Sequence, residues 1–338
     1  MRVLVAGGAG YIGSHVVLDL VRAGHQVVVV DNLSTGYRDF VHPSATFFEA
    51  DITDGLQLDA IFAQENFDVV MHFAAKLVVS ESLKMPLDYY WNNVEGVRSL
   101  LSSMLRAGVN NIVFSSTAAV YGNSDVAEPL TESSPLLPIN PYGASKLAAE
   151  QLIQWTAAAH GFKYAILRYF NAAGADYSMK VGLRSNNYTH LVPLAVRAAL
   201  AGAGDVQSDQ KTCLKVFGDD WPTPDGSCVR DYVHVSDLSS AHLLAADYLL
   251  QQNKSLLLNL GTEKGSSVFE VIAAVDKLSP CPYQIVGRRA GDPALLIADA
   301  AKARESLGWQ AQYNLADIVQ SDYDFRTHTE QSSRPEWI

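Results

Sequence analysis

Cysteine, long apolar runs and excess positive charge are all scarce in this 338-residue chain. The only cysteines are Cys213, Cys228 and Cys281, and no two are closely spaced, which favours a reducing, cytoplasmic location over a disulfide framework. No apolar run approaches the ~18 residues of a membrane span. The formal net charge of −11 argues against nucleic acid or an anionic membrane as a partner.

Internal repeats and low-complexity tracts are also lacking. Apolar residues make up 48% of the chain, enough for a substantial core, and the length predicts one large domain or two closely packed ones. Met1 and Arg2 lead directly into an apolar run, so we expect no removable signal segment. These properties alone do not select a function.

A glycine-rich turn, from Gly7 to Gly13, lies between a first apolar run and a helix-like stretch. Closely spaced glycines let a backbone approach a pyrophosphate, which then binds the free N–H groups of the helix N-terminus. The second apolar run ends at Asp31, close to the expected spacing of about 20 residues for a carboxylate that binds an adenosine ribose. That carboxylate would repel a 2′-phosphate, so the pattern indicates NAD rather than NADP. A glycine-rich turn without a ligand is the simpler alternative, which the strand and helix around it make less attractive.

A second pattern, Tyr142 and Lys146, lies in an alanine- and leucine-rich segment that begins near Pro141. Residues at this spacing share a helix face. A phenol has a pKa near 10, but a nearby ammonium and a positive nicotinamide ring would favour the phenolate. In isolation such a pair is usually two surface residues. Here an apolar run also ends in Ser115, Ser116 and Thr117, where an open α/β sheet binds its ligands, so Thr117 could share a substrate hydroxyl with Tyr142.

Apolar runs alternate with helix-like stretches up to about residue 175. Strands are expected near residues 2–6, 26–30, 46–49, 68–73, 111–116 and 164–169. This rhythm predicts an α/β fold, a Rossmann-type doubly wound parallel sheet with right-handed crossovers, formed by residues 1–175. Residues 176–338 are interpreted as mainly a smaller α/β substrate-binding domain, with about 231–251 packing back on the first domain.

Together these motifs resemble the extended short-chain dehydrogenase/reductase family, and within it the branch that epimerises UDP-hexoses at C4. The likeness runs from Met1 to about Trp309, and its most specific segments are Asp225–Val235 and Arg288–Asp292. It implies an isomerase that interconverts UDP-glucose and UDP-galactose with tightly bound NAD. It also implies a homodimer built through helices near 93–106 and 143–159.

The resemblance implies a mechanism without net oxidation. Tyr142, as a phenolate, would take the proton of the sugar 4-hydroxyl, with Thr117 relaying or aligning it. The C4 hydride would move to NAD⁺, the transient 4-keto sugar would turn over, and both hydride and proton would return. Lys146 would bind the nicotinamide ribose and favour the phenolate. Related 4,6-dehydratases carry an acidic pair after the strand-end Thr, whereas this chain has Ala118 and Ala119, which disfavours dehydration.

The site residues that follow from this resemblance fall into two groups, and no metal ligands are among them. The predicted NAD contacts are Gly7, Gly10, Tyr11, Ile12, Gly13, Asp31, Asn32, Asp51, Ile52, Phe73, Ala74, Ala75, Asn92, Ser115, Tyr142, Lys146 and Tyr169. The predicted substrate contacts are Thr117, Asn171, His190, Leu191, Phe217, Arg230, Tyr232, Arg289, Asp292 and Leu296. Among these, the planar guanidinium groups of the two arginines suit phosphate oxygens.

Departures from the family pattern leave alternatives open. His190 stands where many relatives have asparagine, and it could equally be a helix N-terminal histidine without a ligand. Lys76 lies one place before the lysine of some relatives and is not assigned. Leu296 falls near a gate beside the sugar C2 group, where small residues admit N-acetyl groups and bulky aromatic ones exclude them.

Three kinds of function therefore compete. The first is UDP-hexose 4-epimerisation. The second is a related reaction, either epimerisation of UDP-N-acetylhexosamines, uronates or pentoses, or a decarboxylation, for which no carboxylate-binding motif is found. The third is a non-catalytic dinucleotide sensor, which would have no need of Tyr142 and Lys146.

Overall fold

The computed structural model describes residues 1–123, 128–185, 187–203, 213–289 and 292–331. Its larger part is built on a seven-stranded sheet of order β10-β6-β5-β4-β1-β2-β3. The strands are β1 (Arg2–Ala6), β2 (Gln26–Asp31), β3 (Thr46–Glu49), β4 (Val69–His72), β5 (Asn111–Thr117), β6 (Lys163–Tyr169) and β10 (Leu256–Leu260). All neighbouring pairs are parallel. The predicted doubly wound α/β fold and its six strands are therefore confirmed, while β10 was not predicted.

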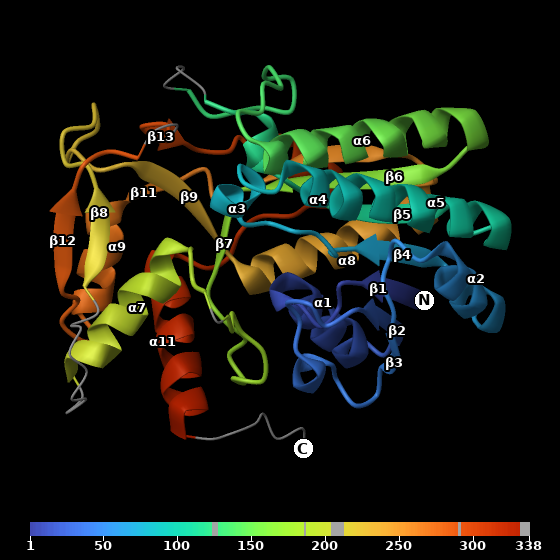
Figure 1. Cartoon of the computed structure of the whole chain (residues 1–338), viewed down its shortest axis with the longest axis horizontal. Coiled ribbons are helices and arrows are strands. Elements are labelled where there is room, and N and C mark those ends of the chain that lie inside the picture. The colour runs from blue at the N-terminus through green and yellow to red at the C-terminus, as the bar shows by residue number, and fades with distance from the viewer. Residues whose placement is uncertain (124–127, 186, 204–212, 290–291, 332–338) are drawn as a thin grey trace.

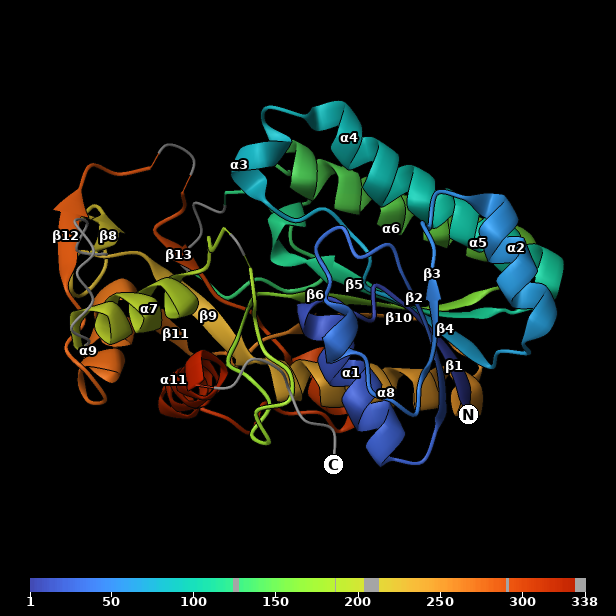
Figure 2. The ribbon, with the colours of Figure 1, turned by 60° about the horizontal axis from the view of Figure 1, so that its bottom comes forward.

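Helices cover both faces of this sheet (Figure 2). One face carries α1 (Tyr11–Arg22), α8 (Val235–Gln252) and α10 (Ala301–Leu307), and the other carries α2 (Gly55–Gln64), α5 (Gly96–Ala107) and α6 (Pro141–His160). Alternate residues of β1 serve the two cores, because successive side chains of a strand point to opposite faces. Val3 and Val5 pack toward α1, and Leu4 and Ala6 pack toward α2 and α5.

Shorter elements connect these layers. They are α3 (Val79–Ser82), α4 (Pro86–Tyr90), a π-helical turn (Trp91–Glu95), and two 3₁₀ turns at Arg38–Phe40 and Ala118–Val120. In the sheet order, β2 and β3 lie on one side of β1, and β4, β5 and β6 lie on the other. The side on which successive strands are added therefore changes at β1. Such a switch point opens a crevice at the carboxyl ends of the strands, where ligands bind in this class of fold.

The smaller part of the molecule has two short sheets and three helices, on the left in Figure 1. Strand β9 (Val229–His234) pairs with β7 (Asn171–Ala173), β11 (Gly265–Ser267) and β13 (Leu295–Leu296), and β8 (Leu214–Phe217) pairs with β12 (Tyr283–Val286). The helices are α7 (Leu191–Ala203), α9 (Val268–Asp276) and α11 (Leu315–Gln331), which share one apolar core.

Strand β9 of the small sheet ends at His234, and α8, which covers one face of the large sheet, begins at the next residue, Val235. Helix α8 packs against α1, β5 and β6. The indole N–H of Trp309 donates to the carbonyl of Asp237 at 2.9 Å, which fastens the segment after α10 to this helix. Within the described ranges, no helix is both long and apolar enough to cross a membrane.

Candidate active site

In the glycine turn between β1 and α1, the backbone packs closely against the segment that follows β4. Gly7 has a φ of 83°, and a Cβ on it would lie 2.4 Å from the Ala74 nitrogen. A Cβ on Gly13 would lie 2.1 Å from the Gly7 carbonyl oxygen, and the Gly10 N–H donates to that same oxygen at 3.2 Å. Because no side chain could stand here, the turn has the shape that a pyrophosphate needs at a helix N-terminus. The residues present therefore fit a dinucleotide.

Asp31, at the end of β2, is buried and braces this turn. Its Oδ2 accepts from the Ala9 N–H at 3.0 Å, and its Oδ1 accepts from the Leu33 N–H at 2.8 Å. Burial raises the pKa of the Asp31 carboxyl, and these two hydrogen bonds oppose the shift. A carboxylate offers about four acceptor positions, so capacity is left for a ribose hydroxyl. The bracing contact was not part of the sequence prediction.

The predicted contacts that follow β2 and β3 also meet. The Asn32 amide donates to Asp51 Oδ2 at 2.8 Å, and the Thr53 hydroxyl and N–H donate to Oδ1. Burial favours the protonated form of Asp51, but these hydrogen bonds outweigh it and lower the pKa of the carboxyl. Ile52 lies in the core beneath them, where a Cβ on Gly96 would come within 2.4 Å of its Cδ1.

The segment after β4 runs beside the glycine turn, since the N–H groups of Phe73 and Ala74 both donate to the Ala6 carbonyl, at 2.7 and 3.0 Å. Ala75 is the next residue of this segment. Asn92 donates to the Oδ1 of Asn93 at 2.9 Å.

Asn93 itself was not predicted, yet it is almost fully buried and joins two parts of the site. Its Oδ1 accepts from the Lys76 N–H at 2.8 Å, and its amide donates at 3.0 Å both to the Lys76 carbonyl and to the Ser145 hydroxyl. It thereby ties the segment after β4 to helix α6. The structure thus gives Lys76 a backbone role that sequence alone did not assign.

Helix α6 starts where its sequence directs. The Asn140 side chain accepts from the Gly143 N–H at 2.9 Å, and Pro141 occupies the first turn. Tyr142 therefore lies in the first turn, and its phenol lies beside the Thr117 side chain at the end of β5. Burial raises the pKa of the Tyr142 phenol, and the Thr117 side chain opposes that shift. The sequence prediction of a lowered pKa rested on a nearby ammonium and a bound nicotinamide ring, and it did not include the desolvation of the phenol that the structure adds.

Lys146, one turn along α6, is buried against the same strand. Its Nζ lies 4.2 Å from the centroid of the Phe114 ring, a cation–π distance. Burial lowers the pKa of the Lys146 ammonium to about 7, and Glu150 opposes the shift. The His72 ring stacks on Phe114 at 5.7 Å, and burial together with Lys146 lowers the pKa of His72 to about 3. His72 is thus neutral, and the protonation of Lys146 near neutral pH depends on the groups around it.

Three further predicted contacts lie among buried polar groups. The Ser115 hydroxyl is 2.9 Å from the Nε2 atom of His242 in α8, and Ser115 lies opposite Leu167 where β5 pairs with β6, the strand that ends at Tyr169. Burial raises the pKa of Tyr169. The Tyr11 hydroxyl donates to the Gly174 carbonyl at 2.6 Å, which links the start of α1 to the segment after β7. Its neighbour Ile12 packs against the core beneath α1.

The small sheet places the predicted substrate contacts next to one another. Pairing of β7 with β9 sets Asn171 beside Tyr232, and pairing of β13 with β9 sets Leu296 beside Arg230. Leu296 also packs against the apolar cluster that contains Ala118, the residue after Thr117. The predicted sugar gate and the catalytic strand end are therefore in contact through one cluster.

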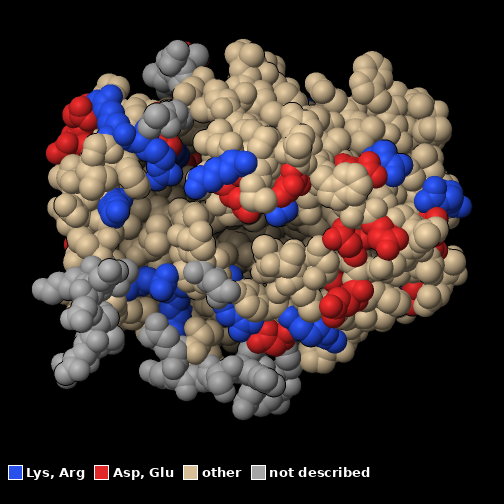
Figure 3. Space-filling model, in the orientation of Figure 1, with Lys and Arg blue, Asp and Glu red and all other residues tan. Residues whose placement is uncertain are grey.

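A second group of predicted substrate contacts lies at the end of the small sheet formed by β8 and β12. The Arg289 guanidinium stands 4.2 Å over the Phe217 ring, and its Nε is 3.7 Å from Asp292 Oδ2. Residues 290–291, between these two, lie outside the described residues. His190 and Leu191 open α7, and burial lowers the pKa of His190. Lys and Arg side chains lie around the hollow in the middle of the face shown in Figure 3, with Asp and Glu side chains among them.

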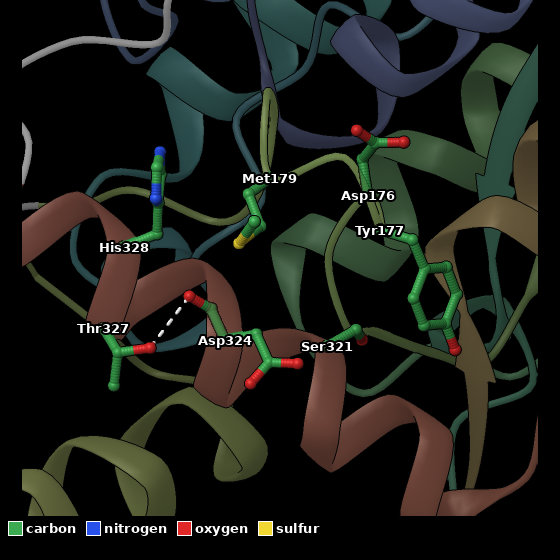
Figure 4. A pocket seen from close by; sticks show the side chains of 7 residues that line it. All are labelled: Asp176, Tyr177, Met179, Ser321, Asp324, Thr327 and His328. Atoms are coloured by element: carbon green, nitrogen blue, oxygen red, sulfur yellow. Dashed lines mark hydrogen bonds between the residues drawn. The ribbon is translucent and has the colours of Figure 1, made fainter.

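A separate cavity of about 320 Å³ lies between the segment after β7 and helix α11 (Figure 4). Tyr177 and Met179 line it on one side, and Asp324 and His328 on the other. None of the predicted site residues lines it. Its Asp176 carboxylate is held by Arg22 at 3.0 Å, so part of its acidic lining is already neutralised.

The chain was compared with known proteins. A family model described as "NAD dependent epimerase/dehydratase family" matches residues 3–261. The chain is 47% identical to the UDP-glucose 4-epimerase of Halalkalibacterium halodurans, over 93% of this chain and 91% of that protein.

Two solved structures are similar over nearly the whole chain. One is the UDP-glucose-4-epimerase from Stenotrophomonas maltophila with bound NAD and formylated UDP-arabinopyranose, with a TM-score of 0.92, 40% identity, and 98% and 99% of the two chains covered. The other is the UDP-Glc/GlcNAc 4-epimerase of Campylobacter jejuni, with a TM-score of 0.82, 43% identity, and 97% and 99% covered.

Proposed function

The chain belongs to the NAD dependent epimerase/dehydratase family, and we propose that it reversibly epimerises UDP-hexoses at C4, interconverting UDP-glucose and UDP-galactose. One observation carries the proposal from the family to the reaction. The Tyr142 phenol lies beside the Thr117 side chain at the carboxyl end of β5, and Lys146 lies one turn along the same helix. That is an acid–base group, an aligning hydroxyl and a cation at the crevice of the sheet.

NAD, when bound, accepts a hydride from the sugar C4 and returns it. The residues that would hold it are the glycine turn, Asp31 at the adenosine ribose, and Lys146 at the nicotinamide ribose. The turn supports this assignment, because its glycines bring the backbone close together at the N-terminus of α1, where a pyrophosphate binds the free N–H groups.

Tyr142 and Thr117 would handle the proton of the sugar 4-hydroxyl. Burial alone favours the protonated phenol, so the proposal needs a positive charge on the same side of Tyr142. Lys146, on the same helix face, supplies it. Ala118 and Ala119 follow Thr117, so the two positions after the strand end offer no carboxylate for elimination of water.

Arg230, Arg289 and Asp292 would hold the nucleotide. The guanidinium forks suit the two phosphates, and the Phe217 ring beneath Arg289 offers a flat apolar surface to a base. Asn171, Tyr232, His190 and Leu191 would complete the substrate contacts. The proposal requires the nucleotide to be held tightly and the hexose loosely, so that the keto sugar can present its other face.

We further propose that the protein is a homodimer, built through the face of α5 and α6. Apolar side chains lie exposed along these helices and beside them on α4, with Leu87 82% and Trp155 75% exposed. The helices run side by side in both ribbon views (Figures 1 and 2). Large apolar side chains exposed on neighbouring helices favour a protein–protein contact. The free thiols of Cys213, Cys228 and Cys281 support a cytoplasmic location.

The function is tested with the purified protein, UDP-galactose and no added cofactor. Products are resolved by chromatography, the denatured protein is assayed for released NAD, and Tyr142→Phe serves as the matched control. Formation of UDP-glucose by the parent protein, with NAD released on denaturation, supports the proposal. Retained NAD without conversion would redirect it to UDP-uronates or pentoses. Absence of both, even after NAD is added, would contradict it.

A second substrate class has its own supporting observation. Leu296 is intermediate in size between the small and the bulky aromatic side chains of the gate, and its cluster combines the small Ala118 and Ala298 with larger apolar side chains. UDP-N-acetylgalactosamine is therefore the second substrate to assay.

A further inference from the structure

A buried ion pair lies directly behind the Tyr142 and Lys146 row of α6. Glu150 continues that row by one more turn and is 1% exposed. Arg168, in β6 and 2% exposed, donates to both of its carboxylate oxygens: its Nε lies 3.0 Å from Oε1, and its Nη2 lies 2.6 Å from Oε2. The Ser116 hydroxyl also donates to Oε1.

Stability alone is a poor explanation for this pair. Removing two charges from water costs about as much as their attraction returns, and apolar side chains of the same volume often do as well. The location suggests another role. Glu150 lies one turn from Lys146, and Ser116 immediately precedes Thr117. The pair therefore joins the helix that carries Tyr142 to the strand end that carries its hydroxyl partner.

The same hydrogen bonds continue toward the sugar gate. Arg168 Nη1 donates to the Tyr121 hydroxyl at 3.1 Å, and that hydroxyl donates to Asn259 Oδ1 at 2.6 Å. The Asn259 amide donates to the Leu130 carbonyl at 2.7 Å, and the Leu130 N–H donates to the carbonyl of Ile297, next to Leu296. One buried network thus contacts the catalytic helix, the catalytic strand end and the gate.

Among the described residues, the elements packed around α6 carry the charged residues Glu81, Asp88, Glu95, Arg98, Arg106, Lys163 and Arg168, together with Tyr90 and Tyr164. The titratable groups near α6 whose pKa is shifted by burial are His72, Tyr89, Tyr121 and Tyr169. His72 is neutral because burial and Lys146 hold its pKa near 3, and burial raises the pKa of all three of these tyrosines, so they are neutral too. Glu81 is tied to the Tyr89 hydroxyl at 2.9 Å. Of these groups and Glu150, Glu150 is the charge with a resolved effect on the pKa of Lys146. Glu150 and Arg168 are therefore the pair best placed to act on the charge of Lys146.

We propose that Glu150 and Arg168 are positioning residues that set the charge of Lys146 and hold α6 against the strand end of Thr117. Glu150 stabilises the ammonium across one helical turn, and Arg168 limits that effect by neutralising part of the carboxylate charge. The expected effect on catalysis rests on the proposed function. The expected effect on the charge of Lys146 involves only residues of this chain.

The two partners should consequently have opposite effects. Glu150→Gln leaves Arg168 unopposed and should move the titration midpoint of Lys146 to lower pH by about two units, the scale expected for one charge about 6 Å away at an effective dielectric constant near 20. Arg168→Gln leaves the carboxylate unopposed and should move it to higher pH by a similar amount. Ser116→Ala removes a hydrogen bond but no charge, and should leave the midpoint within a few tenths of a unit.

The experiment is an NMR titration of the full chain carrying ¹³Cε-labelled lysine, with the Lys146 resonance assigned by Lys146→Arg. The pH profile of kcat/KM is recorded for the same variants and should shift in the same directions, with little change in KM. Opposite displacements support the proposal. Displacements in one direction, or unchanged midpoints with only a loss of stability, would overturn it.

The same titration on the wild-type protein does not depend on whether a variant folds. A Lys146 midpoint near neutral pH supports the proposal, whereas a midpoint in the ordinary lysine range would overturn it. The titration is independent of substrate. Opposite NMR shifts in a protein that does not act on UDP-hexoses would uphold the electrostatic pair and refute the proposed function, and normal turnover without the shifts would do the reverse.

Discussion

The Thr117 side chain, at the carboxyl end of β5, lies beside the Tyr142 phenol at the N-terminus of α6 and lowers the pKa that burial raises. Thr117 Oγ1 accepts from the Ala119 N–H at 3.1 Å, which fixes its orientation. Two residues from separate elements are thereby held as one proton-handling unit. The proposed reaction depends on this pair of side chains.

Replacing Tyr142 with phenylalanine should lower turnover of UDP-galactose at least about 10²-fold, the usual scale for a positioned acid–base group. The ring is retained, so packing and NAD retention should change little. Initial rates measure the effect. Tyr283→Phe, which removes an exposed hydroxyl from β12, is the matched control and should leave the rate unchanged. Near-normal turnover in Tyr142→Phe would remove this residue from the proposed role.

Asp31→Ala should weaken NAD retention and relax the rejection of NADP, because the carboxylate that would repel a 2′-phosphate is lost. It should also lower the free energy of unfolding by about 1–3 kcal/mol, since the N–H groups of Ala9 and Leu33 lose their acceptor. Denaturant unfolding and analysis of the released nucleotide measure the two effects separately. An unchanged cofactor preference would count against the ribose contact, whatever happens to stability.

Lys146→Met should abolish most turnover and yet remove a cost of folding. Because burial lowers the pKa of Lys146 to about 7, the folded state must hold a costly charge below that pH, whereas the unfolded chain keeps the same charge in water up to about pH 10.5. The penalty is fully present below pH 7 and disappears as the pH rises from 7 toward 10.5. The stability of the wild type relative to Lys146→Met should therefore increase across that window, by roughly 3–5 kcal/mol at most.

Urea unfolding of both proteins at several pH values measures that slope. A constant offset, from lost packing or weaker nucleotide binding, does not affect it. A stability difference that is flat between pH 7 and 10 would show that Lys146 is not desolvated as the structure has it.

Leu296→Tyr should reduce the rate with UDP-N-acetylgalactosamine relative to UDP-galactose, and Leu296→Ala should raise that ratio. The side chain packs against the cluster beside the catalytic strand end, so its bulk decides the space left near the sugar. Leu295→Tyr is the matched control, because neighbouring residues of a strand point to opposite faces. Equal rate ratios in all three variants would place the gate elsewhere.

Most strands of the large sheet were predictable because they are buried on both faces and read as continuous apolar runs. The exception is β10, where Leu256–Leu260 is a five-residue, leucine-rich run that contains Asn259. Such a run does not distinguish a strand from a helix by pattern, and the strand is defined only by its pairing with β6. The amide that obscures the pattern is the same one that bonds to Tyr121 and Leu130.

The polar network behind the site was not predicted, for a related reason. Glu150 and Arg168 are charged residues that resemble surface positions until β6 and α6 pack together. One signal was available, since Glu150 continues the four-residue spacing of Tyr142 and Lys146 on one helix face. The rise in the pKa of Tyr142 had no such signal, because desolvation depends on packing that a sequence does not display.

The most direct test of the central claim follows the hydrogen on C4. UDP-galactose carrying deuterium at C4 is incubated with the protein without added cofactor, and the UDP-glucose formed is examined by NMR and mass spectrometry. The account predicts that the deuterium is found at C4 of the product and that none exchanges with water, because the hydrogen removed is the one returned. Loss of the label to solvent, or its appearance at another carbon, would contradict epimerisation through a 4-keto sugar.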